Sequence, residues 1–170
     1  MAIRFNINTK TAIEALLWVI QRGENNIYNI MKILYAAEKY HLNTYACPIT
    51  GDRYIAMKFG TVPSWIFDCT KRDNPSLGFT KIDNNTLKAN REPDLDYLSE
   101  SNIEALEHGF SEYAGLNFDE VLKKNHKEIA WKRAYISRGN GNSVDIMFED
   151  MIDEEWLIDD LTQFAQFMVV

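Results

Sequence analysis

The apolar positions of the first 45 residues recur at helical spacing. Between about Thr11 and Gln21 one stripe is formed by Ile13, Leu16, Leu17 and Ile20. Thr11 and Glu14 stand three residues apart, as in a capping box, so this helix is expected to begin at Thr11. A second stripe runs from about Asn26 to His41 without an internal glycine or proline. The sequence therefore predicts two consecutive amphipathic helices.

The pattern then changes to the alternation that is typical of strands. The segment RYIAMKF (53–59) alternates and is rich in β-forming residues, which predicts a strand that ends near Gly60. Pro63 suits the first position of a new helix, because the missing N–H has no helical partner there. That helix is expected to stop near Pro75. The side chains expected to face inward in it are Trp65, Ile66 and Cys69.

A hairpin and further helices complete the predicted elements. Residues 78–90 favour a hairpin that turns at Asp83-Asn84-Asn85, residues that tolerate a left-handed backbone. Cap signals at Ser99 and Ser101, with Glu104 placed to complete a box, predict a helix start. Further helices are expected at 117–125, 127–136 and about 153–167. In the last of them, one side is formed by Leu157, Leu161, Phe164 and Met168.

These elements predict a single domain that spans residues 1–170. The class is mostly α (α+β): a helical bundle with a small antiparallel three-stranded sheet or hairpin inserted after the second helix. We find no repeat, low-complexity segment or linker long enough to divide the chain.

The negative charge is concentrated near the C-terminus. The net charge is -7, and residues 145–160 hold eight acids and no base. An acidic surface can steer a basic partner, while the simpler interpretation is a solvated helix face. The candidate partner-facing residues are Glu154, Glu155, Asp159 and Asp160. This charge balance does not favour nucleic acid as a partner.

No familiar catalytic or metal-binding pattern is present. The sequence lacks a P-loop, a dinucleotide fingerprint and the H-E-x-x-H motif, and its three histidines lie in separate segments. The two cysteines, Cys47 and Cys69, form no C-x-x-C pair and are expected to be free thiols. A thiol nucleophile paired with His126 is the alternative. We therefore expect neither a metal nor another cofactor.

Two further features bear on surroundings and partners. The chain shows no secretory signal and no apolar run of membrane-spanning length, so we expect a cytoplasmic protein without a membrane partner. The loop SRGNGNS (137–143) favours a plain loop, with an anion-binding nest as the alternative.

The segment CPITGDRYIAMKFGTVPSWIFD (47–68) favours a structural corner over a phosphate cradle. A cradle runs from a strand through glycines into a helix N-terminus, whereas Gly51 precedes the predicted strand. Gly60 does precede a helix, but Val62-Pro63 reduce the supply of free amides. Asp52 and Arg53 are expected to clamp the corner as a charge-assisted pair.

Residues 32–68, KILYAAEKYHLNTYACPITGDRYIAMKFGTVPSWIFD, resemble the signature of the Panacea domain family of SocA-like antitoxins and GepA-like phage-associated proteins. The first half of the pattern is matched by Lys32, Leu34, Tyr35, Ala37 and Glu38. The second half is matched by Pro48, Ile49, Thr50, Gly51, Asp52, Tyr54, Ala56, Met57, Gly60, Val62 and Pro63. Thr61 departs from it, because the family usually has proline there.

The resemblance continues to about residue 136. YLSESNIEAL (97–106) is similar to a family helix start, and NHKEIAWKRAY (125–135) resembles the T-H-x-x-x-A-W segment, with Asn125 where threonine is usual. The motif core is thus about 26–136, followed by the acidic helix at about 153–167. The residues that the resemblance and the corner together mark as structural are Thr50, Gly51, Asp52, Arg53, Tyr54, Met57, Gly60, Pro63, His126 and Trp131. We also expect Tyr35 and Trp131 to be buried, with Trp131→Ala costing about 3 to 5 kcal/mol.

The resemblance implies an antitoxin without enzymatic activity. Such a protein neutralises a cognate toxin through direct contact or by delivering it to a protease, with a chaperone as a further possible partner, in a phage or prophage setting. Two alternatives come from the residues. The basic hairpin 78–91 beside short helices suits a winged-helix DNA-binding autoregulator, and Asp52, His126 or a cysteine suits an uncharacterised hydrolase.

Overall fold

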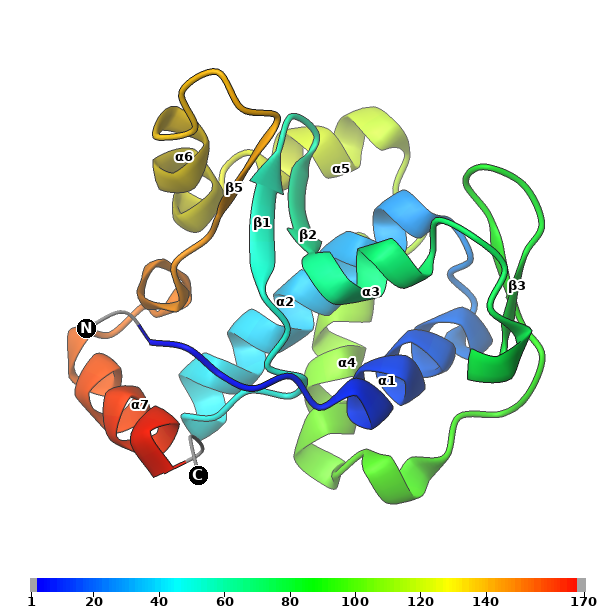
Figure 1. Cartoon of the computed structure of the whole chain (residues 1–170), viewed down its shortest axis with the longest axis horizontal. Helices are drawn as coiled ribbons and strands as arrows, with labels where there is room; N and C mark the ends of the chain where they lie inside the picture. Colours follow the sequence, from blue (N-terminus) through cyan, green and yellow to red (C-terminus); the bar gives the residue numbers. More distant parts are fainter. Residues whose placement is uncertain (1–2, 168–170) are drawn as a thin grey trace.

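Helix α2 (Ile27–Tyr45) runs through the centre of the computed structural model, which describes residues 3–167 (Figure 1). The helix begins after Asn26, whose side chain accepts hydrogen bonds from the backbone N–H groups of Tyr28 and Asn29. Its most extensive contact is with α4 (Glu100–Tyr113). A Cβ atom at Gly109 of α4 would lie 2.3 Å from the Ile33 carbonyl oxygen, so only glycine allows the two helices to approach this closely.

The other elements surround α2. The remaining helices are α1 (Thr9–Arg22), α3 (Ser64–Cys69), α5 (Phe118–Asn125), α6 (Ile129–Ile136) and α7 (Glu155–Phe167). The strands are β1 (Tyr54–Met57), β2 (Gly60–Pro63), β3 (Phe79–Lys81), β4 (Leu87–Ala89) and β5 (Ser143–Asp145). The described residues also include the short 3-10 turns η1 (Pro75–Leu77), η2 (Leu95–Tyr97) and η3 (Phe148–Met151). This confirms the α+β class with a small antiparallel sheet.

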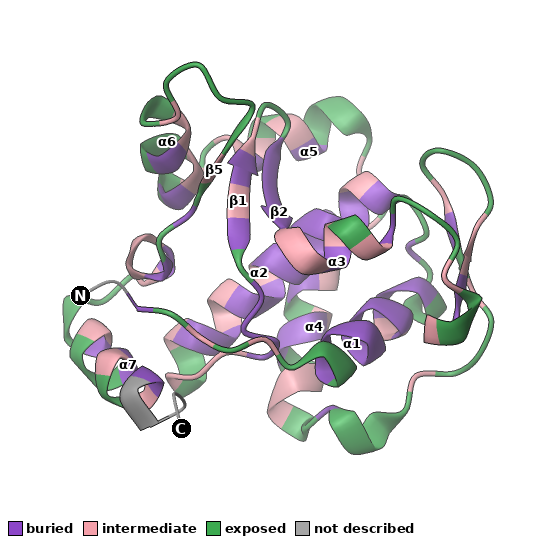
Figure 2. Cartoon of the chain, viewed as in Figure 1, coloured by how far each residue is buried: buried purple, intermediate pink, exposed green. Residues whose placement is uncertain are grey.

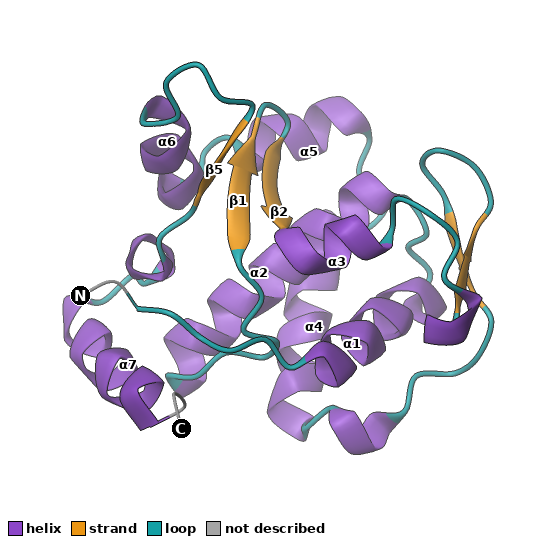
Figure 3. Cartoon of the chain, in the orientation of Figure 1, coloured by secondary structure: helices purple, strands orange, loops and turns teal. Residues whose placement is uncertain are grey.

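In the part of the chain that the structure describes, the strands form two separate antiparallel sheets (Figure 3). β1 is the central strand of the first and pairs with both β2 and β5. The predicted strand over 53–59 is therefore too long, because the chain turns at Lys58-Phe59 and returns as β2. The predicted hairpin with its turn at 83–85 is confirmed as β3–β4. It does not join the first sheet, whose third strand is residues 143–145 and begins at the last residue of the loop expected at 137–143.

Several helix ends differ from the prediction because they are capped by other residues than the expected ones. Helix α1 begins two residues early, because Asn8 and not Thr11 is its cap. Pro63 ends β2 and precedes α3, and α3 stops at Cys69 with only Ile66 fully buried. The start of α4 is a capping box of Ser99 with Asn102, so Glu104 plays no part in it. The predicted helix that opens at 117–120 is confirmed, with its own capping box.

Within residues 3–167 the core consists of two apolar clusters that share α2, and Figure 2 shows α2 and most of α1 among the buried parts. The larger cluster joins α1, α2 and α4 with the two hairpins. The smaller one packs Tyr35 and Tyr54 against α6, η3 and the inner face of α7. Tyr35 is buried as predicted, at 1% exposed. The expectation for Trp131 is wrong in degree, because this side chain is only half-buried at the edge of the smaller cluster.

The acidic segment 145–160 is not one helix. It passes through β5 and η3 before α7 begins at Glu155, so Asp153 and Glu154 precede the helix. Leu157 and Leu161 are buried, which confirms the inner face of α7, and Met168 lies outside the described residues. Within residues 3–167, no helix combines the length and the apolar character that crossing a membrane requires.

Candidate functional site

Glu38 organises the corner that follows α2. Its carboxylate is 1% exposed and accepts hydrogen bonds from the backbone N–H groups of Ile49 (2.6 Å) and Gly51 (3.0 Å). The backbone N–H and the hydroxyl of Thr50 donate to it as well. Burial raises the pKa of Glu38, and these hydrogen bonds oppose the rise by stabilising the ionised form. The P-I-T-G segment is thus folded around a buried carboxylate, which the sequence pattern alone did not indicate.

Asp52 continues this corner by capping α3. Its two carboxylate oxygens accept the backbone N–H groups of Trp65 (3.0 Å) and Ile66 (3.1 Å). The expected pair with Arg53 is wrong, because no ion pair joins the two side chains; the exposed Arg53 guanidinium donates to the Ser64 hydroxyl (3.2 Å) and lies 3.6 Å from the Asp145 carboxylate. Asp52 therefore fixes the direction in which α3 leaves β2.

Thr61 and Asn125, the two positions that depart from the family pattern, contact each other. The Thr61 N–H donates to the Asn125 side-chain oxygen (2.8 Å), and the Asn125 amide donates to the Thr61 hydroxyl (3.0 Å). Proline at position 61 has no N–H and would lose the first of these bonds. Gly60 makes the contact possible, because a Cβ atom there would lie 2.2 Å from the Asn125 oxygen. We interpret the two departures as a matched pair.

His126 and Trp131 hold the turn between β1 and β2. Their rings stack at 3.9 Å, the His126 Nε2 atom lies 3.0 Å from the Lys58 carbonyl oxygen, and the Trp131 indole N–H donates to the Met57 carbonyl (2.8 Å). Burial lowers the pKa of His126, against the opposing effect of the Lys58 carbonyl. Tyr54 and Met57, as residues of β1, complete the predicted structural set.

The side chains of the hydrolase alternative are not brought together. Asp52 and His126 lie at opposite ends of β1. Cys47 lies beside His41, with Sγ and Nδ1 separated by 3.7 Å, and not beside the expected His126. Burial raises the pKa of the Cys47 thiol, which disfavours the reactive thiolate. Among the described residues, no group of three or more His, Cys, Asp or Glu side chains is placed to hold a metal ion.

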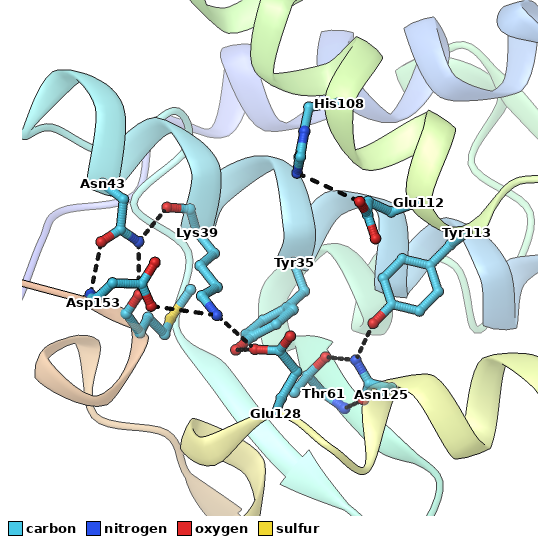
Figure 4. A network of polar contacts seen from close by, with 11 residues as sticks. Tyr35, Lys39, Asn43, Thr61, His108, Glu112, Tyr113, Asn125, Glu128 and Asp153 are labelled. Atoms are coloured by element: carbon cyan, nitrogen blue, oxygen red, sulfur yellow. Dashed lines mark hydrogen bonds and ion pairs between the residues drawn. The ribbon is translucent and has the colours of Figure 1, made fainter.

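A polar network joins α2 to the acidic segment (Figure 4). The Lys39 amine donates to Glu128 (3.0 Å) and lies 3.7 Å from Asp153, while the Tyr35 hydroxyl donates to the same Glu128 oxygen (3.0 Å). The Asn43 side chain accepts the backbone N–H of Asp153 (2.8 Å). The chain entering α7 is therefore anchored, and α7 has a defined orientation on the body.

An exposed acidic patch covers the entry to α7 and its outer face; we define it as Glu154, Glu155, Trp156, Asp159 and Asp160. All five side chains are exposed, and Trp156 is 63% exposed. The four acids make no ion pair with any side chain of residues 3–167. The positions of these acids were predicted, whereas Trp156 was missed, although a tryptophan within an acidic run is itself a signal for a binding surface.

The comparison with known families identifies the class. A sequence model described as "Antitoxin SocA-like, Panacea domain" matches residues 30–132, from α2 into α6. The match covers more than half of the chain, so the protein belongs to the SocA-like Panacea domain family. Searches of curated proteins and of solved structures gave no match. The matched range contains the Glu38 corner, the Asp52 cap and the Thr61–Asn125 pair, and it ends before the acidic patch.

Proposed function

We propose that this protein is an antitoxin that neutralises a cognate protein toxin by direct contact and that it catalyses no reaction. Membership of the antitoxin-like family supports the role. The mode of binding is supported by the acidic patch, in which an exposed tryptophan lies among four acids at the anchored entry to α7 and on its outer face.

The composition of the patch suits a basic partner surface. A toxin that acts on tRNA or on nucleotides needs cationic groups for its anionic substrate, and carboxylates can cover these groups in place of the substrate. Trp156 adds a large apolar contact of the kind that often dominates binding energy at interfaces. Delivery of the captured toxin to a protease is a second route that the same contact would serve. We place the gene in a phage or prophage setting, beside its toxin.

The test is toxin association measured with a charge-reversed patch. Glu154, Glu155, Asp159 and Asp160 are replaced together by lysine, and association with the toxin encoded by the neighbouring gene is followed at low ionic strength. We expect the charge-reversed variant to fold normally and to associate with the toxin at least severalfold more slowly, because charges at the rim of an interface mainly set the association rate. An unchanged rate would show that the patch is only a solvated face.

A matched control keeps the change in net charge and moves it elsewhere. Glu92, Asp96, Glu100 and Asp119 are exposed acids on other elements. Their replacement by lysine should leave toxin association close to wild type. If both quadruple variants slow association equally, net charge and not the patch is responsible.

A DNA-binding role predicts a different behaviour. Retention of the wild-type protein on heparin at low salt, where a DNA-binding protein is held, would favour that alternative. We expect the protein to pass through such a column, given its net charge of -7.

A further inference from the structure

A pocket of about 700 Å³ opens between the start of α2, the β1–β2 turn and the loop that precedes β5. This volume lies within the range of small-molecule sites. Apolar side chains form most of its wall: Met31, Met57, Phe59, Val62 and Phe67. It belongs to neither the acidic patch nor the polar network of Figure 4.

A buried lysine lines this pocket. Lys32 is 1% exposed, and its amine makes no hydrogen bond or ion pair with any residue of the described part of the chain. Its contact is with the face of the Tyr28 ring, whose centroid lies 4.4 Å from Nζ. Burial lowers the pKa of Lys32 to about 7. Gly60 makes room for the stem, since a Cβ atom there would lie 2.8 Å from the Lys32 Cε atom.

The other charged groups at the pocket are also cationic. Lys58 and Arg138 line it, and among the lining residues of the described chain there is no aspartate or glutamate. The Arg138 guanidinium is held against the Tyr135 ring at 3.7 Å and donates to the Tyr135 carbonyl (2.8 Å). An unpaired buried cation is costly, and Lys32 is buried among apolar walls, with the exposed Lys58 and the partly exposed Arg138 nearby and no acidic side chain among the described lining residues. A bound anion would give these cations a counter-charge.

We propose that this pocket binds a small organic anion, with its carboxylate or phosphate group on Lys32 and its apolar or aromatic body against the Met57, Phe59 and Phe67 wall. Lys58 and Arg138 at the mouth attract the same charge. The anion supplies the partner that Lys32 lacks, and the apolar body fills a volume that a free inorganic anion would leave to water. The site is independent of toxin binding by the acidic patch.

The test uses two probes that differ in charge. Anilinonaphthalene sulfonate carries an anionic group on an aromatic body, and N-phenyl-1-naphthylamine is its uncharged counterpart. Binding of both is followed by fluorescence to the wild type and to Lys32→Met, a side chain of similar length without charge. We expect Lys32→Met to weaken the sulfonate at least tenfold and to leave the neutral probe within about twofold, on the order of 1.4 kcal/mol per tenfold change.

Two outcomes would overturn the proposal. One is sulfonate affinity that is equal in the wild type and in Lys32→Met. The other is an equal loss for both probes, which would make the effect one of pocket shape and not of charge. Lys88→Met removes an exposed lysine on β4, away from the pocket, and is the matched control that should bind both probes as the wild type does.

A second variant keeps the test valid if Lys32→Met fails to fold. Lys58 is exposed and Arg138 is partly exposed, so Lys58→Met with Arg138→Gln leaves the core untouched. This pair should weaken the sulfonate severalfold without affecting the neutral probe, and no change would count against the proposal. Toxin association measured on the same variants separates this site from the proposed function.

Competition with the sulfonate probe identifies the anionic group. Displacement by adenosine monophosphate but not by adenosine would indicate a phosphate ligand. Displacement by decanoate but not by decanol would indicate a carboxylate ligand. If the uncharged compounds compete as well as the charged ones, the anion has no role and the proposal is wrong.

Discussion

Two charged side chains of α2, Lys32 and Glu38, are each 1% exposed, yet they lie in contrasting surroundings. The Glu38 carboxylate accepts hydrogen bonds from the backbone of three consecutive residues and from one hydroxyl. The Lys32 amine has an aromatic ring beside it and an open pocket in front of it, with no acceptor among residues 3–167. The two regions show that burial alone does not distinguish a charged side chain with a structural role from one with a binding role, whereas its hydrogen-bond partners do.

The difference has a physical basis. A buried carboxylate that accepts hydrogen bonds from several N–H groups replaces its hydrogen bonds to water with equivalent ones in the protein. The same N–H groups would be costly to bury without an acceptor. A buried ammonium without acceptors lowers stability, and such a residue is found where function requires it. We therefore interpret the Glu38 region as scaffold and the Lys32 region as a binding site.

Glu38→Ala should have the largest effect on stability. The substitution leaves the N–H groups of Ile49, Thr50 and Gly51 buried without an acceptor, so we expect the free energy of unfolding to fall by about 3 to 5 kcal/mol. Urea unfolding followed by circular dichroism measures this loss. Glu38→Gln keeps one side-chain oxygen and should lose less. A Glu38→Ala curve that overlaps the wild type would remove the scaffold interpretation.

Trp131→Ala tests the β1–β2 turn beside the pocket. Because Trp131 is half-buried, we expect a loss of about 2 to 3 kcal/mol, less than the value expected from its sequence pattern alone. The substitution removes the ring stacking on His126 and the hydrogen bond from the indole N–H to the Met57 carbonyl. Thermal unfolding measures the change. A melting temperature within a degree or two of the wild type would show that the turn does not depend on this side chain.

Lys32→Met should stabilise the protein, in a pH-dependent manner. The pKa of Lys32 is near 10.5 when unfolded and about 7 when folded, so the unfolded chain binds more protons between these values. Burial of the charged Lys32 amine therefore lowers the stability of the wild type by its full amount below pH 7, and this loss disappears as the pH rises towards 10.5. We expect the free energy of unfolding of Lys32→Met to exceed that of the wild type by on the order of 2 kcal/mol at pH 6 and by less at pH 9.

The measurement for this prediction is urea unfolding of both proteins at pH 6 and pH 9. The difference between the two proteins isolates Lys32 from other titrating groups, among which His126, Lys58 and Arg138 are close to it or to the same pocket. A variant that is less stable than the wild type at pH 6 would show that Lys32 is well accommodated, and the contrast with Glu38 would be lost.

Asp52→Asn should have the smallest effect. Asparagine has one side-chain oxygen, so it can accept from the backbone of Trp65 or Ile66 but not from both with separate oxygens. We expect a loss of about 1 kcal/mol and an unchanged ability to bind the toxin. Chemical unfolding and a toxin-association assay check the two parts. Loss of toxin binding in a normally folded variant would assign Asp52 a direct role and would favour the hydrolase alternative.

The sequence by itself determined the elements whose signals are local. The stripe of α2, the capping box of α5 and the turn at Asp83–Asn85 each depend on residues within a few positions of one another. The long motif also placed the chain in its family. Backbone propensity and side-chain periodicity act over such distances, so these features could be predicted without the rest of the molecule.

The tertiary structure decided what the charged residues do. The pairing of β1 with residues 143–145, the contact of Thr61 with Asn125 and the bond of Glu128 to Lys39 join positions 64 to 90 residues apart. Whether Glu38 or Lys32 finds acceptors depends on such distant segments, because a buried polar group is satisfied by whatever the fold places within hydrogen-bond distance. Both side chains are buried because other elements surround α2, and only the folded chain gives Glu38 its hydrogen-bond partners and leaves Lys32 facing a pocket.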